Sequence, residues 1–221
     1  MRKNEHTKTF PELVAEYKGF KAHRDFEALV RTHGVSLPLL QAVVTQRLLP
    51  KDEACRLWGD SLGVAYVDPF VSIVTDDAVQ AIPQEIAKKA NVMGLYVVDG
   101  VLTVAMSRPT DAELVKRLSQ IVQMPVSPVF SFQTDIADAV QIHYSNEKNL
   151  EDCLSELEAN SAFAQGELST DRLAALADSE SMIKVLDEVI YFALRERATD
   201  IHIEAHETVS RIRFRIDGRL R

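Results

Sequence analysis

The fold of this chain is decided near its C-terminus, by a stretch that reads Asp200-Ile201-His202-Ile203-Glu204 and, after a polar connector, Arg211-Ile212-Arg213-Phe214-Arg215-Ile216-Asp217-Gly218. Both segments alternate strictly between polar and apolar residues, which is the pattern of a strand buried on one face. The pair Asp217-Gly218 suits a tight hairpin turn, because glycine takes a positive φ at no steric cost. The stretch therefore predicts two strands, a tight turn and the start of a third strand.

A helix is expected immediately before these strands, in residues 182–197. Apolar residues recur there at the spacing of one helical face, at Ile183, Leu186, Ile190, Ala193 and Leu194. Ala198-Thr199-Asp200 then breaks the helical period. Residues 182–221 are therefore predicted to be the start of an α+β domain, which stops inside its third strand.

The predicted second strand carries an unusual number of arginines. Five of the eleven residues from 211 to 221 are arginines, in a chain whose formal net charge is −8. A charged strand face is often simply solvated. Planar guanidinium groups on a rigid strand also suit a phosphate ligand, so an anion site is the alternative. Nucleic acid is a poorer candidate, because the chain is acidic and shows no basic stripe with interleaved aromatic residues.

The segment before this domain, residues 145–181, is read as an acidic linker. It holds nine acidic and two basic side chains, together with several serine, asparagine and glycine residues. Such a composition buries too little apolar surface to form its own core. A short helix around Leu150, Leu154 and Leu157 is compatible with the pattern.

Residues 1–62 are predicted to form a helical subdomain with three short helices. The first has an apolar face at Phe26, Leu29 and Val30, and Ser36 and Pro50 lie at the starts of the other two. Trp58 in the third helix reads either as a core residue or as a docking residue. Cys55 on the same helix reads as a small core residue, because no histidine at helical spacing could activate it.

Residues 63–144 are predicted to form a compact α+β domain in the order β-α-β-β-α-β-α. Asp99-Gly100 between two apolar runs is a hairpin signal, and Asp111 follows a strand and can cap a helix. The expected elements are a strand at 64–67, a helix at 83–90, strands at 92–98 and 101–106, a helix after Asp111, a strand at 125–132 and a helix capped by Thr134.

Several functional classes are disfavoured by the sequence. Cys55 and Cys153 are isolated, so neither a disulfide framework nor a zinc site is indicated, and a reducing cytoplasm is expected. No signal peptide and no long apolar run is present. His202 and Glu204 share a strand face with His206 nearby, but no fourth ligand accompanies them and a metal site is not expected. None of the eight glycines is followed by lysine, so the P-loop that would cradle ATP phosphates is missing.

The C-terminal stretch resembles a known family. Ala198-Thr199-Asp200-Ile201-His202-Ile203-Glu204 followed by Arg213-Phe214-Arg215-Ile216-Asp217-Gly218 is similar to the start of the core in the traffic ATPases of type II secretion and type IV pilus assembly. The middle of the chain extends the resemblance to the N-terminal domain of the same ATPases. The residues that carry it are Leu62-Gly63-Val64-Ala65-Tyr66-Val67-Asp68 and Val101-Leu102-Thr103-Val104-Ala105-Met106-Ser107-Arg108-Pro109-Thr110-Asp111.

The resemblance implies a function for the chain. It implies the N-terminal portion of a hexameric motor, cut before the P-loop and inactive by itself, with ATP and Mg²⁺ belonging to the full-length protein. Its second domain would be PAS-like. The chain would dock the motor onto inner-membrane platform proteins at the cytoplasmic face of that membrane. Arg213, Arg215 and Arg219 would be candidates for contacting the nucleotide held by a neighbouring ATPase subunit.

A regulatory role is the alternative implied by the resemblance. Many relatives bind cyclic di-GMP through this N-terminal region, using helical motifs that open with Arg-Leu-Gly. That tripeptide is absent here, and the nearest helical turn reads Thr32-His33-Gly34-Val35. Weak or no binding of cyclic di-GMP is therefore expected.

Overall fold

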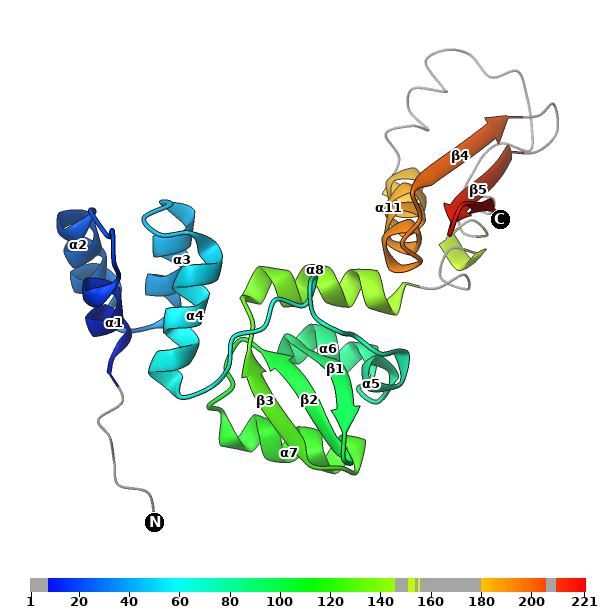
Figure 1. Cartoon of the computed structure of the whole chain (residues 1–221). Coiled ribbons are helices and arrows are strands. Elements are labelled where there is room, and N and C mark those ends of the chain that lie inside the picture. The colour runs from blue at the N-terminus through cyan, green and yellow to red at the C-terminus, as the bar shows by residue number, and fades with distance from the viewer. Residues whose placement is uncertain (1–7, 146–150, 154, 156–179, 206–209) are drawn as a thin grey trace. The chain divides into compact units, whose positions relative to one another are not determined.

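The computed structural model describes residues 8–145, 151–153, 155, 180–205 and 210–221, and it confirms the α+β class (Figure 1). The chain forms two compact units, Met1–Val140 and Gln141–Arg221. The domain boundaries expected at residues 62, 144 and 181 stay predictions. Most of the expected acidic linker, including Leu150, Leu154 and Leu157, lies outside the described residues.

From residue 8, where its described part starts, the first unit begins with four helices where three were predicted. They are α1 (Phe10–Glu16), α2 (His23–His33), α3 (Leu37–Thr45) and α4 (Lys51–Leu62). The additional helix, α1, is only seven residues long and would be marginal in isolation. The side chain of Glu12 accepts a hydrogen bond of 2.7 Å from the backbone N–H of Thr9, which satisfies a donor at the start of the helix.

The helices pack around a cluster of aromatic rings. Phe10 meets Phe26 and Trp58 edge to face, with ring centroids 6.2 and 5.2 Å apart, and Trp58 is only 5% exposed. Trp58 is therefore a core residue of this unit. The same cluster takes in Phe130 and Phe132, which come from the α+β part of the chain far along the sequence.

A three-stranded sheet forms the centre of the α+β part, in the order β1 (Val92–Val98), β2 (Val101–Met106) and β3 (Val126–Phe130). Strands β1 and β2 are the predicted antiparallel hairpin. Asp99 and Gly100 take positive φ values of 50° and 74° in its turn. Strand β3 runs parallel to β2, and Figure 1 shows β2 between its two neighbours.

Two short helices precede the sheet, and one of them explains a glycine in β1. These are α5 (Asp76–Gln80), which was not predicted, and α6 (Gln84–Ala90), which was. A Cβ atom at Gly94 would lie 2.0 Å from the carbonyl oxygen of Ala78 in α5, so only glycine allows this approach. The β1–β2 pairing also shifts register between Gly94 and Tyr96, which places a bulge at Leu95.

The parallel strand is reached through α7 (Ala112–Val122), and α8 (Gln133–Tyr144) follows it. Asp111 caps α7 as predicted, because its side chain accepts a 3.0 Å hydrogen bond from the backbone N–H of Leu114. The expected cap of the last helix is wrong by two residues, since α8 begins at Gln133 and Thr134 lies inside it.

The strand expected at 64–67 is instead a single parallel bridge between Tyr66 and Phe130. Two hydrogen bonds form it: Val67 N–H donates to the Phe130 carbonyl and Phe130 N–H donates to the Ala65 carbonyl. The segment is kept short on both sides. Gly63 ends α4 in the left-handed conformation, and the side chain of Asp68 accepts a hydrogen bond from Phe70 N–H, which turns the chain away.

The second unit contains the predicted helix and strands. They are α11 (Glu180–Arg195), β4 (Asp200–Ala205), β5 (Ser210–Ile216) and β6 (Arg219–Leu220). The three strands form an antiparallel sheet in the order β4-β5-β6. Val185, Val189 and Ala193 of α11 pack against Phe214 of β5. Asp217 and Gly218 form the second tight turn, with φ values of 50° and 76°.

The apolar surface of this unit is only partly covered. Phe214 is 8% exposed, whereas Ile203 on the same sheet face is 61% exposed. Helix α11 also carries a second apolar row, which is exposed at Ile183, Leu186, Ile190 and Leu194. No helix among the described residues is long and apolar enough to cross a membrane.

Candidate functional site

Arg213 and Arg215 of β5 and Arg219 of β6 are the site residues that the sequence singled out. Because residues directly opposite in an antiparallel pair share a face, the register decides what lies beside them. Arg213 lies opposite His202, and Arg215 lies opposite Asp200. Arg211, Arg213 and Arg215 therefore share the face that points away from Phe214, as the alternation predicted.

Two of the candidate arginines are engaged in ion pairs across the hairpin. Arg213 Nη1 lies 3.5 Å from Glu204 Oε1, and Arg215 Nε lies 3.0 Å from Asp200 Oδ2. All four side chains are between a third and a half exposed, so each pair contributes about 0–1 kcal/mol to stability. Pairs this weak can exchange their carboxylate for a phosphate at little cost.

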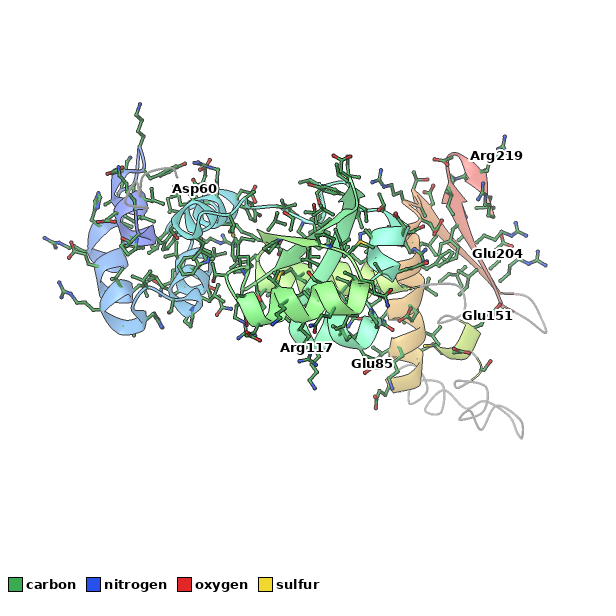
Figure 2. All side chains as sticks on the ribbon, turned by 90° about the horizontal axis from the view of Figure 1, so that it is seen from below. Asp60, Glu85, Arg117, Glu151, Glu204 and Arg219 are labelled. Carbon is green, nitrogen blue, oxygen red and sulfur yellow. The ribbon has the colours of Figure 1, made fainter. Side chains whose placement is uncertain are left out.

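The third candidate, Arg219, is separated from the other two. Arg219 lies opposite Ile216 across the turn. Because opposite residues share a face, Arg219 lies on the sheet face that carries Phe214 and Ile212. Figure 2 shows Glu204 and Arg219 on this sheet, from β4 and β6. The structure thus brings Arg213 and Arg215 together and leaves Arg219 apart, and the nucleotide-contacting role of all three stays a prediction.

A second candidate site lies in the first unit, where α3 and α4 meet the loop after β2. A hollow of about 190 Å³ is lined by Leu37, Trp58, Leu62, Ser107, Arg108, Thr110 and Asp111. The indole N–H of Trp58 is buried, and among the described residues it has no hydrogen-bond acceptor. An indole donor beside a guanidinium group could receive an anionic or carbonyl oxygen.

The polar junction between α4 and α8 holds the helical part against the sheet. Lys51 Nζ donates to Asp135 Oδ1 and lies 5.5 Å from the ring centroid of Phe132. Asp135 is buried, so this ion pair is shielded from solvent on its carboxylate side. Cys55 is buried beside it, and desolvation together with the charge of Asp135 raises the pKa of its thiol to about 12. Cys55 is therefore a neutral core residue rather than a nucleophile.

Sequence reasoning missed both the hollow and the junction. Trp58 and Arg108, and likewise Lys51 and Asp135, are joined only by the tertiary fold, and no local motif links them. The sequence offered one signal for the hollow, the presence of a single tryptophan, Trp58, on the apolar face of a predicted helix. In the part of the chain that the structure describes, no three metal-ligating side chains come together, His202 and Glu204 included.

Two protein families match this chain. The MshEN domain matches residues 62–150, and the family described as type II/IV secretion system protein matches residues 175–221. The order of these two matches confirms the resemblance to the N-terminal region of secretion and pilus ATPases that the sequence motifs suggested.

Curated relatives carry the names of these ATPases. The chain is 28% identical over 165 residues to the type IV pilus assembly ATPase PilB of Myxococcus xanthus (strain DK1622), covering 72% of this chain and 29% of PilB. It is 35% identical over 95 residues to the type II secretion system protein E of Klebsiella pneumoniae, covering 42% of this chain and 17% of that protein. The chain therefore spans less than a third of the length of either relative.

Two solved structures were also found to match part of this chain. The structure of MshE with cdg covers 62% of this chain and 99% of its own, at 18% identity and a TM-score of 0.49. The N-terminal domain of XpsE covers 64% of this chain and 97% of its own, at 15% identity and a TM-score of 0.42.

Proposed function

We propose that this chain is the docking and regulatory N-terminal portion of a hexameric ATPase that powers type II secretion or type IV pilus assembly. In this role it couples the motor to an inner-membrane platform protein, at the cytoplasmic face of that membrane. The observation that supports the proposal most directly is the order of the two family matches, with an MshEN domain at 62–150 and the secretion-protein domain from 175.

ATP hydrolysis would belong to the full-length protein. The chain has no Gly-Lys-Ser/Thr segment to hold the β- and γ-phosphates, so it is expected to show no ATP turnover by itself. ATP and Mg²⁺ would bind the nucleotide domain of the full-length protein. Arg213 and Arg215, which share a face and form only weak ion pairs, are the better candidates for reaching a neighbouring subunit's nucleotide.

Docking is tested by direct binding. The cytoplasmic domain of the platform protein from the same secretion or pilus system is titrated with the whole chain by calorimetry. Saturable one-to-one binding with a Kd below about 100 µM, worth about 5.5 kcal/mol, supports the proposal. No binding in that range, with both proteins folded by circular dichroism, overturns it.

A cyclic di-GMP receptor is the second candidate, favoured by Trp58, whose indole N–H has no acceptor among the described residues and which lines the same hollow as Arg108. The hollow they line measures about 190 Å³, which is below the roughly 300–1,000 Å³ of pockets that enclose drug-sized ligands. The hollow would have to widen to take a cyclic dinucleotide, so weak or no binding is expected.

Titration of the chain with cyclic di-GMP separates the two candidates. Saturable micromolar binding that is lost in both Trp58→Phe and Arg108→Ala would favour the receptor. Trp58→Phe keeps an aromatic ring in the core but removes the N–H donor together with the five-membered ring of the indole, so the free energy of unfolding of each variant is measured as the control for lost packing.

A further inference from the structure

A groove in the described part of the first unit lies between α6 and α7. It has a volume of about 640 Å³. Its lining combines apolar, basic and a few other polar side chains: Ile86, Lys89, Ala90, Arg108, Asp111, Glu113, Leu114, Lys116, Arg117, Leu118, Gln120 and Ile121. All of these residues belong to α6, to α7 or to the loop that leads into α7. The groove is therefore separate from the arginine strand of the second unit.

The floor of the groove is apolar. Leu114, Leu118 and Ile121 lie at positions i, i+4 and i+7 of α7, and Ile86 and Ala90 lie at positions i and i+4 of α6. Leu118 is fully buried and the other four are half-buried. A strip of half-buried apolar side chains extends along both helices and has no covering element among the described residues.

The rim of the groove is basic. Lys89, Arg108, Lys116 and Arg117 are exposed, and among the described residues none of these four forms an ion pair. Two carboxylates, Asp111 and Glu113, also line the groove, so its lining carries four formal positive and two formal negative charges. Figure 2 shows Arg117 extending outward from α7. This surface is positive although the chain as a whole has a net charge of −8.

We infer that this groove binds an amphipathic helix of a partner protein, with the helix's leucine-type side chains on the apolar floor and its acidic side chains against the basic rim. The inference rests on the proposed docking function and names a surface for it. The groove follows α7 from its cap, Asp111, to Ile121, a length of about 15 Å or three helical turns. That length suits helix-in-groove recognition.

Other ligands fit the groove less well. A small anion site needs buried, fixed donors, and the four cations here are exposed. No aromatic side chain lines the groove, so it offers no stacking surface for nucleic acid bases. A flat bilayer surface would reach the basic rim but not a recessed floor. Charge and shape together therefore select an acidic helix.

The inference is tested with a defined peptide. The probe is a synthetic, fluorescently labelled helix of about 14 residues, with leucine at i, i+3, i+4 and i+7 and glutamate elsewhere. Its partner probe has lysine in place of every glutamate. By fluorescence anisotropy, the acidic peptide is expected to bind the whole chain at least about tenfold tighter than the lysine peptide, with an affinity that falls as salt rises.

Two variants separate the groove from general electrostatics. Lys116→Glu/Arg117→Glu is expected to weaken acidic-peptide binding at least about tenfold. The control Lys21→Glu/Arg24→Glu makes the same charge change at exposed positions on and just before α2, away from the groove, and is expected to change binding less than about twofold. Leu114→Ser tests the floor, with circular dichroism confirming that each variant is folded.

Three results would overturn the inference. They are equal binding of the two peptides, equal effects of the two charge reversals, and groove-dependent binding to vesicles containing phosphatidylglycerol without peptide binding.

The platform-protein titration distinguishes failure of the groove proposal from failure of the docking proposal. A platform domain that binds the wild type and the Lys116→Glu/Arg117→Glu variant equally refutes the groove and leaves docking intact. A platform domain that binds neither refutes docking.

Discussion

Two hairpins in the described part of the chain have the same Asp-Gly turn, and their strands differ in burial and in their neighbours. Asp99-Gly100 and Asp217-Gly218 take nearly identical backbone conformations, with φ values of 50° and 74° and of 50° and 76°. Strands β1 and β2 are largely buried and are joined by a parallel third strand. Strands β5 and β6 carry arginines, and Ile203 on the neighbouring strand is exposed.

This difference shows that turn chemistry and burial have separate origins. The Asp-Gly pair fixes the local return of the chain, because both residues reach the left-handed region at low cost. Burial of the first hairpin depends on elements distant from the turn, namely α5 against Gly94 and β3 beside β2. Among the described residues, the second hairpin is covered by the preceding helix, α11, and by Cys153.

The largest effect is expected at Gly94. Gly94→Val would place a side chain against the backbone of α5, where even a Cβ atom lies 2.0 Å from the carbonyl oxygen of Ala78. A loss of more than about 4 kcal/mol in the free energy of unfolding of the first unit is expected, because backbone must move. Urea denaturation followed by the fluorescence of Trp58, the only tryptophan, measures it.

A matched substitution in the first turn serves as the control for that experiment. Gly100 has open space around its Cα but a φ of 74°, which asparagine tolerates better than most residues, so Gly100→Asn is expected to cost only about 1 kcal/mol. Equal destabilisation by the two changes would contradict the close approach of α5 to β1.

The same truncation in each core compares the two units directly. Phe130 is fully buried and Phe214 is 8% exposed at the edge of a partly covered face. Phe130→Ala is expected to destabilise the first unit by about 3–5 kcal/mol, and Phe214→Ala the second by about 2–3 kcal/mol. Amide hydrogen exchange in α4 and in α11 reports the two units separately. A larger loss in α11 than in α4 would reverse the comparison.

The two cysteines test burial and pH dependence. Burial raises the pKa of the Cys55 thiol to about 12, from an ordinary value near 9. The unfolded chain therefore loses this proton first, so the free energy of unfolding of the first unit should fall as pH rises from 9 toward 12. Cys55→Ala should reduce that slope.

Thiol labelling at pH 8 gives an independent reading of the same difference. Cys153 is half-buried and is expected to react with an aromatic disulfide reagent, whereas Cys55 is expected to stay unmodified until the first unit unfolds. Rapid labelling of Cys55 in the native chain would show that its site is open to solvent.

The smallest effect on stability is expected at the arginine strand. Alanine at Arg213 or Arg215 removes one exposed ion pair and should cost about 0–1 kcal/mol, and Arg219→Ala should cost less. In a full-length hexamer, replacing the arginine that reaches a neighbour's nucleotide with alanine should lower the ATPase rate by about 10³-fold or more. Unchanged rates in all three variants would leave only a solvated strand face.

The features that the sequence predicted correctly have signals contained in a few adjacent residues. The two Asp-Gly turns, the Asp111 cap and the alternation of β5 each follow from local backbone chemistry. The common face of Arg213 and Arg215 follows from alternation as well. Their partners, Asp200 and Glu204, depend on the hairpin register and could not be read from the arginines themselves.

The features that the sequence missed are short or depend on distant contacts. Helix α5 is five residues long, too short to show a helical period, and it is held by packing against β1. Helix α1 had two usable signals, the capping residues Thr9 and Glu12 and a proline, Pro11, in its first turn. The α6–α7 groove and the Trp58–Arg108 hollow exist only once helices and loops are placed around the sheet.

The presence of Phe130 and Phe132 in the core of the N-terminal helices has a consequence for synthesis of the chain. The ribosome releases α1 to α4 first, and their shared core stays incomplete until about 70 further residues have been made, which at 5–20 residues per second takes about 4 to 14 s. During that interval the apolar faces of Phe10, Leu39 and Trp58 lack part of their covering.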